Sequence, residues 1–129
     1  MKYSLILLLL IFSQNIFSQE NQEDIVIEYS EIQVKPEYPG GMKSFYGFIA
    51  KNFRAPEEEN LNGEIIIKYI VEKDGTMTNM VIVKDVGFKT GEEAIRVLRL
   101  MPKWRQGEHE GKYARTSHSV KINVGAAKK

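Results

Sequence analysis

The chain has 129 residues, of which 18 are basic and 17 are acidic, so its formal net charge is +1. A charge this close to zero gives no argument for nucleic acid as a partner. The chain contains no cysteine, which excludes disulfides, thiol catalysis and cysteine-ligated zinc sites.

The charges are distributed unevenly along the chain. Acidic residues gather between positions 20 and 37, and basic residues gather between positions 96 and 129. Solvated faces and an acidic flexible arm account for this pattern. The alternative is a basic C-terminal surface that attracts an acidic segment of a partner.

The first residues have the pattern of a secretory signal peptide. Met1 and Lys2 give a short positive start, and the apolar run "SLILLLLIF" extends from Ser4 to Phe12. A run of this length is too short to span a bilayer, which takes roughly 20 residues. It predicts a signal peptide over residues 1–19, cleaved near residues 18–20, with an uncleaved anchor as the alternative.

The remainder is enough chain for one domain with a core of its own. We expect an acidic linker over residues 20–31, a domain over residues 32–125 and a disordered tail over residues 126–129. Within this range, "IVIEYSEIQV" (residues 25–34) favours β structure and predicts a single edge segment.

The run "PEYPGG" (residues 36–41) contains Pro36, Pro39, Gly40 and Gly41. Pro39 fixes one backbone dihedral, and the two glycines permit a sharp entry into a helix. A phosphate-binding loop would need a glycine immediately before its lysine, but Met42 precedes Lys43. The run therefore predicts a hinge.

A first helix is predicted after this hinge. Met42, Phe45, Ile49 and Phe53 recur at helical spacing, which indicates one buried helical face. The helix is expected to end near Pro56, because proline cannot continue a helical hydrogen-bond ladder.

The clearest segment is a β-hairpin over residues 63–72 and 76–86. Lys73, Asp74 and Gly75 separate two β-rich runs, and an Asp-Gly pair in this setting is a strong hairpin signal. The first run has apolar residues on both faces, which predicts a central strand.

A second helix is predicted from Thr90 to Met101. Thr90 and Glu93 have the spacing of a capping box, and Pro102 ends the pattern. Trp104 is expected to plug the core between this helix and the next strand.

A last strand is predicted from Tyr113 to Val124 on the alternation of apolar and polar residues. The hairpin strand 63–72 should be central, with 76–86 on one side and the last strand on the other. The last strand is then an open edge. The fold class is α+β, with two helices packed on one face of a small three-stranded sheet.

No catalytic or metal-binding constellation is indicated by the sequence. His109 lies in a polar loop and His118 on the apolar side of the last strand, without metal-ligand spacing. Glu92 and Glu93 suit the start of a helix. We therefore expect no enzyme activity, no metal and no cofactor.

Several motifs together resemble the TonB C-terminal domain family, in the version common in Bacteroidetes. They are "PEYPGG" before an aromatic helix, "NGEIIIKYIVEKDGTMTNMVIVKDVG", "GEEAIRVLRLMPKW" and "GK" before the last strand. The resemblance covers residues 32 to 124. The sequence departs from the family pattern at Ala55, at Gln106 and in lacking a terminal Pro-Ile pair.

The resemblance implies a periplasmic, non-enzymatic domain that supports transport across the outer membrane. Its last strand would pair with a segment of an outer-membrane transporter or another periplasmic protein, the strand-addition mode of recognition. Arg115 and Lys121 would steer an acidic or polar segment. The residues carried over to this pairing strand are Tyr113, Arg115, Ser117, Ser119, Lys121 and Asn123.

The alternative is a standalone interaction domain that uses the same edge to form a homodimer or to bind one fixed partner, without energy transduction. Concentration-dependent oligomerisation would distinguish it. A small hydrolase is a third reading, and it would need a concave site with perturbed titratable groups.

Overall fold

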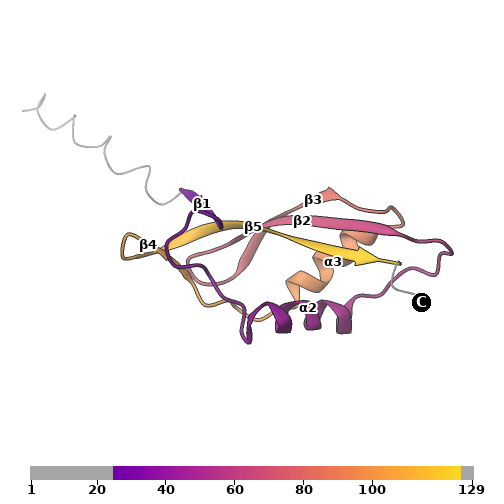
Figure 1. Ribbon diagram of the computed structural model, residues 1–129, viewed down its shortest axis with the longest axis horizontal. Helices are drawn as coiled ribbons and strands as arrows, with labels where there is room; N and C mark the ends of the chain where they lie inside the picture. The colour runs from indigo at the N-terminus through magenta and orange to yellow at the C-terminus, as the bar shows by residue number, and fades with distance from the viewer. Residues whose placement is uncertain (1–24, 126–129) are drawn as a thin grey trace, which may run out of the picture.

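The computed structural model describes residues 25–125, so the predicted signal peptide and the predicted tail lie outside the described residues. Both helices lie on one face of a sheet (Figure 1), which gives an α+β fold. The elements in chain order are β1 (Val26–Glu28), α2 (Gly41–Asn52), β2 (Gly63–Val71), β3 (Met77–Lys84), α3 (Thr90–Arg99), β4 (Gly107–His109) and β5 (Lys112–Val124). Within residues 25–125, neither helix has the length and apolar character needed to cross a membrane.

The sheet has five strands rather than the three predicted. The strand order is β1-β5-β2-β3, and β4 pairs with the start of β5. β2 lies between β3 and β5 and is antiparallel to both, which confirms the predicted central strand. β1 pairs with β5 in parallel and lies within residues 20–31, the range predicted to be a linker.

The core lies between the sheet and the helices. Alternate residues of β2 are fully buried on the helix side of the sheet, and residues of both helices and of β5 complete the same cluster. Each fully buried aliphatic or aromatic side chain contributes about 1.5–3 kcal/mol. The buried residues of this cluster include Phe45, Ile49, Ile65, Ile67, Tyr69, Val71, Val97, Leu98, Trp104 and Val120.

The predicted hinge forms the entry to α2. Gly40 precedes the helix with φ 86° and Gly41 begins it with φ 84°, both in the left-handed region that glycine adopts without strain. The N–H of Gly41 donates to the carbonyl oxygen of Tyr38 over 2.7 Å. The chain therefore makes a tight turn after Pro39.

The predicted hairpin is also present. The Asp74 carboxylate accepts hydrogen bonds from the N–H and the hydroxyl of Thr76 at 3.0 and 2.7 Å. Gly75 has φ 88°, and its carbonyl oxygen accepts a hydrogen bond from the N–H of Trp104 at 2.9 Å. Trp104 is buried, as predicted, and packs against Tyr38, Phe45 and Tyr69.

The predicted capping box at the start of α3 is wrong. Phe88 and Lys89 both have positive φ, so Lys89 takes the cap position and Thr90 becomes the first helical residue. The Thr90 hydroxyl donates backward to the carbonyl oxygen of Gly87 over 2.7 Å. Glu93 instead forms an ion pair with Arg96 at 2.6 Å. The helix ends at Arg99, three residues before Pro102.

The segment between β1 and α2 is tied to the segment before β5. Val34 and Glu108 exchange backbone hydrogen bonds of 2.9 Å in both directions. Ile32 and Pro36 are buried against Gly107, where an added Cβ would lie 2.8 Å from the Cδ1 of Ile32. Residues 32–38 are thus anchored to the domain.

Candidate functional site: the edge of β5

The side of β5 that faces away from β2 is only partly open. β1 pairs there with Arg115 to Ser117, and among residues 25–125 no other strand pairs on that side from residue 118 onward. The prediction of an open edge along the whole strand is therefore wrong for residues 115–117. Within the described part of the chain, the second half of β5 has no partner strand on this side.

The direction of the backbone groups defines the open edge. The N–H of Tyr29 donates to the carbonyl oxygen of Ser117 over 2.9 Å, so the backbone of Ser117 points toward β1 and away from β2. Direction alternates along an antiparallel strand. Ser119, Lys121 and Asn123 therefore direct their N–H and C=O groups to the open side, and all three are exposed. We call residues 119–123 the open edge.

Arg115 does not lie free beside this edge. Its Nε is 2.8 Å from one oxygen of Glu72, and its Nη2 is 3.0 Å from the other. The hydrogen bond from Arg115 is the main reason that the pKa of Glu72 lies below its ordinary value. The guanidinium is therefore occupied within the domain.

The other predicted pairing residues fall into two groups. Tyr113 lies where β4 pairs with β5, and its side chain is exposed. Ser117 is buried beside β1, and its hydroxyl has no hydrogen-bond partner within residues 25–125. Ser119, Lys121 and Asn123 are the predicted residues that lie together on the open edge.

An aromatic cluster that the sequence analysis missed lies where the open edge begins. The ring of Tyr29 stacks on the ring of His118 with centroids 3.9 Å apart. The Tyr69 hydroxyl lies 2.6 Å from His118 Nδ1, and Lys35 Nζ lies 5.2 Å from the Tyr29 centroid. Burial lowers the pKa of His118 and raises that of Tyr69, so this hydrogen bond joins a neutral imidazole to a neutral hydroxyl.

Two hollows lie at the two ends of the open edge. The first hollow, about 440 Å³, lies beside Tyr29, Ser117 and Ser119 and reaches Ile66 and Val83. The second hollow, about 610 Å³, is lined at the far end by residues that include Phe53, Pro56, Glu58, Leu61 and Val124. An extended chain beside the open edge would run between them.

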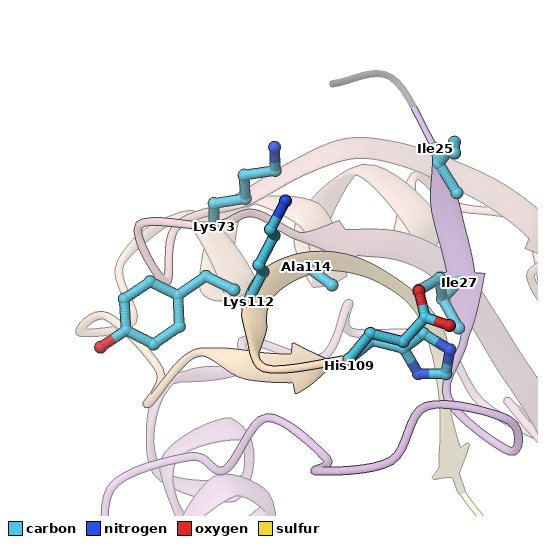
Figure 2. A pocket seen from close by; sticks show the side chains of 8 residues that line it. Ile25, Ile27, Lys73, His109, Lys112 and Ala114 are labelled. Carbon is cyan, nitrogen blue, oxygen red and sulfur yellow. The ribbon is translucent and has the colours of Figure 1, made fainter. Parts of the chain in front are cut away.

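A third hollow, of about 490 Å³, lies near the start of β5. In Figure 2, Ile27 of β1 and Ile25 just before it lie on one side of this hollow, while Lys73 and Lys112 stand on its other side. β1 therefore forms one wall of a hollow rather than a layer of the packed core.

The described residues hold no group of three His, Asp or Glu side chains that could bind a metal ion. What the arrangement offers chemically is a row of backbone donors and acceptors with a mixed apolar and polar surface at each end. Such a row suits an extended polypeptide.

Comparison with known proteins identifies the domain. The family model "Gram-negative bacterial TonB protein C-terminal" matches residues 54–123, more than half of the chain. The solution structure of the Helicobacter pylori TonB C-terminal domain is similar with a TM-score of 0.48 and 17% identity, over 68% of this chain and 96% of that chain. Comparison with curated proteins gave no match.

The matched range begins after α2, so it contains β2 to β5 but neither β1 nor the hinge. It includes the whole open edge. Domains of this family are interaction domains of TonB-dependent transport and are periplasmic in Gram-negative bacteria. This chain belongs to the TonB C-terminal domain family.

Proposed function

We propose that this chain is a periplasmic, non-enzymatic binding module. Its open edge pairs with an extended segment of an outer-membrane TonB-dependent transporter, or of a related protein, in support of transport across the outer membrane. The observation that carries the proposal is the row of Ser119, Lys121 and Asn123, whose backbone groups face away from β2 and whose side chains are exposed.

Backbone pairing alone supports only modest affinity. Each outward-facing residue supplies one donor and one acceptor, and a typical hydrogen bond contributes about 0.5–1.5 kcal/mol net. A segment paired along the open edge would pass both hollows, one at each end of the edge. Side chains that project from this segment could enter them and add to the affinity. The buried Ser117 hydroxyl in the first hollow would gain a hydrogen-bond partner there.

The charge that steers a partner is assigned to Lys121. It is exposed at the centre of the open edge, whereas Arg115 is held by Glu72. Attraction of an acidic segment by an exposed lysine is screened by salt, with a Debye length of about 8 Å at physiological ionic strength. The rate of association should therefore fall as salt is added.

Two neighbouring proline substitutions test the proposal. Ser119→Pro removes a donor on the open side, while Val120→Pro removes one that faces β2. With peptides from transporter plug domains, we expect Ser119→Pro to keep the fold and lose binding. Val120→Pro should lose the fold itself. Amide NMR shifts on the wild-type chain should gather at residues 119–123.

A well-folded Ser119→Pro variant that binds these peptides like the wild type would contradict the proposal. If instead no peptide binds and the chain dimerises with concentration, the standalone interaction domain becomes the better reading. In that case shifts at residues 119–123 on dilution would locate the dimer contact on the same edge.

A further inference from the structure

We propose that β1 is a built-in competitor for the partner strand. It covers residues 115–117 of the β5 edge, and a partner segment that extends beyond the open edge must displace it. This inference rests on the proposed function of the open edge. It extends the binding surface to residues 115–117, where access depends on whether β1 is paired. β1 itself lies outside the range that the family model matches.

β1 and a partner strand would use the same row of backbone groups. In the parallel register, Ile27 lies opposite Thr116, and the N–H of Tyr29 is bonded to the carbonyl oxygen of Ser117. The open edge continues this row from Ser119. Since one side of a strand accepts one partner, a segment that pairs with the open edge and continues past residue 118 meets β1.

β1 is held by few side-chain contacts. It is three residues long, Val26 is 37% exposed, and Ile25 before it is 55% exposed. The half-buried Ile27 contributes to the wall of the third hollow (Figure 2), not to the hydrophobic core. Such a strand can leave without opening the core.

The stacked rings of Tyr29 and His118 hold β1 in place beside residues 115–117, and we call this contact the latch. It lies at the boundary between the covered and the open part of the edge, and Lys35 stands over the Tyr29 ring. A partner strand that reaches His118 must move Tyr29 aside. The latch therefore opposes extension of the partner, not its first contact at residues 119–123.

β1 remains tethered when it leaves. The turn after it is closed by hydrogen bonds from the N–H groups of Glu31 and Ile32 to the carbonyl oxygen of Glu28. Ile32 is 3% exposed, and the exchange of hydrogen bonds between Val34 and Glu108 anchors the chain beyond this turn. A tethered strand competes at a high effective concentration. The apparent affinity for a long partner equals its intrinsic affinity multiplied by the fraction of time that the edge is uncovered.

The test uses two proline variants of the full chain. Ile27→Pro removes an N–H that faces β5, whereas Val26→Pro, the matched control, removes one that faces away. The first probe is a synthetic peptide with the sequence of residues 25–31, added in trans. We expect it to bind Ile27→Pro at least about tenfold more tightly than Val26→Pro, with amide shifts at residues 115–117.

The second probe is the set of transporter plug peptides. Peptides long enough to pass residue 118 should bind Ile27→Pro and Tyr29→Ala more tightly than Val26→Pro, and five-residue peptides should bind all three variants alike. Circular dichroism checks that every variant is folded. Tyr29→Ala removes the latch without a proline, so it still decides the question if Ile27→Pro does not fold.

The outcomes separate the two proposals. Equal affinities of long peptides for Ile27→Pro, Tyr29→Ala and Val26→Pro would overturn the competitor role of β1 while leaving the open edge intact. If no plug peptide binds any variant, the transporter function fails. The peptide of residues 25–31 then still tests the competitor role of β1. If this peptide fails to bind Ile27→Pro or Tyr29→Ala, that role is overturned.

Discussion

Gly75 joins two parts of the chain through its backbone. It has φ 88°, and its carbonyl oxygen is bonded to the N–H of Trp104. A Cβ at this position would lie 2.2 Å from the Trp104 carbonyl oxygen. Gly75→Ala should therefore lower the free energy of unfolding by at least about 2 kcal/mol, as measured by urea denaturation.

Gly47 provides the control for this prediction. It lies in α2, and an added Cβ would meet no atom within 4 Å. Gly47→Ala should raise the free energy of unfolding by roughly 0.5–1 kcal/mol, because alanine has the higher helix propensity. A similar effect of the two substitutions would contradict the close approach at Gly75.

His118 makes the stability of the domain depend on pH. Its folded-state pKa lies below the ordinary value of 6.5 because of burial. Tyr69, Tyr29 and, through the Tyr29 ring, Lys35 surround it, and Glu28 and Lys68 line the hollow beside it. Above about pH 6.5 the imidazole is neutral in both states, so its contribution to stability is complete.

As the pH falls below this value, the unfolded chain binds a proton that the folded chain resists, and stability is lost. Thermal melts should give a lower Tm at pH 5 than at pH 7.5. The difference should shrink in His118→Gln, whose uncharged amide can still form a hydrogen bond with the Tyr69 hydroxyl. An unchanged pH dependence in that variant would assign the effect to other groups.

The residues that sequence reasoning placed correctly are those whose role is local. Gly40, Gly41 and Asp74 act within a few residues of their positions, so turn chemistry predicts them. Turn chemistry also predicts Gly75 in the hairpin turn, but not its contact with Trp104. Arg115 was misjudged because its partner, Glu72, lies 43 residues away. No periodic pattern indicates such a pair.

At the scale of elements, a small ion-pair network joins the two helices. Arg96 Nη2 donates to the carbonyl oxygen of Asn52 at the end of α2 over 2.9 Å. Glu93 binds Arg96 and accepts the N–H of Arg54 at 2.8 Å. These contacts satisfy backbone groups that the end of α2 would otherwise leave to water.

Loss of this network should be measurable. Arg96→Ala is expected to lower the free energy of unfolding, because it leaves the Asn52 carbonyl and the Glu93 carboxylate without that donor. Arg99→Ala, one turn further along the exposed face of α3, should change it by less than about 0.5 kcal/mol. Equal losses in urea denaturation would refute the network.

Of the two shortest strands, β4 was not predicted from the sequence, and β1 was predicted only as an edge segment without a named partner. β4 is joined to β5 by Glu110 and Gly111, both at positive φ, and this pair is a weaker hairpin signal than Asn-Gly or Asp-Gly. β1 has no local partner at all. The segment 25–34 was expected at an edge, but its pairing with residues 115–117 depends on the assembled fold.

Across the whole molecule, local stability should follow the strand order. The central ladder of β2 and β5 joins buried residues such as Ile67 and Val120, while β1 rests on the rim. Amide hydrogen exchange should therefore be slowest at Ile67 and Val120. It should be much faster at Tyr29, because local opening of β1 needs no global unfolding.

The amide of Glu108 serves as the internal reference for this gradient. Its hydrogen bond to Val34 and the bond from Tyr29 to Ser117 both measure 2.9 Å, so bond length predicts equal protection. Because the segment around Val34 is anchored to the domain and β1 is not, we expect slower amide exchange at Glu108 than at Tyr29. Protection of Tyr29 that matches Val120 would mean that β1 belongs to the stable core.

The place of β5 after all of its partner strands in the sequence also sets the order of events when the protein is made. β1, β2 and β4 all pair with β5, so a growing polypeptide has only the β2–β3 hairpin and unsupported helices until residues 112–124 emerge. The core can close only after these residues have been made. This topology alone would delay folding, which suits the export in an unfolded state that the proposed function requires.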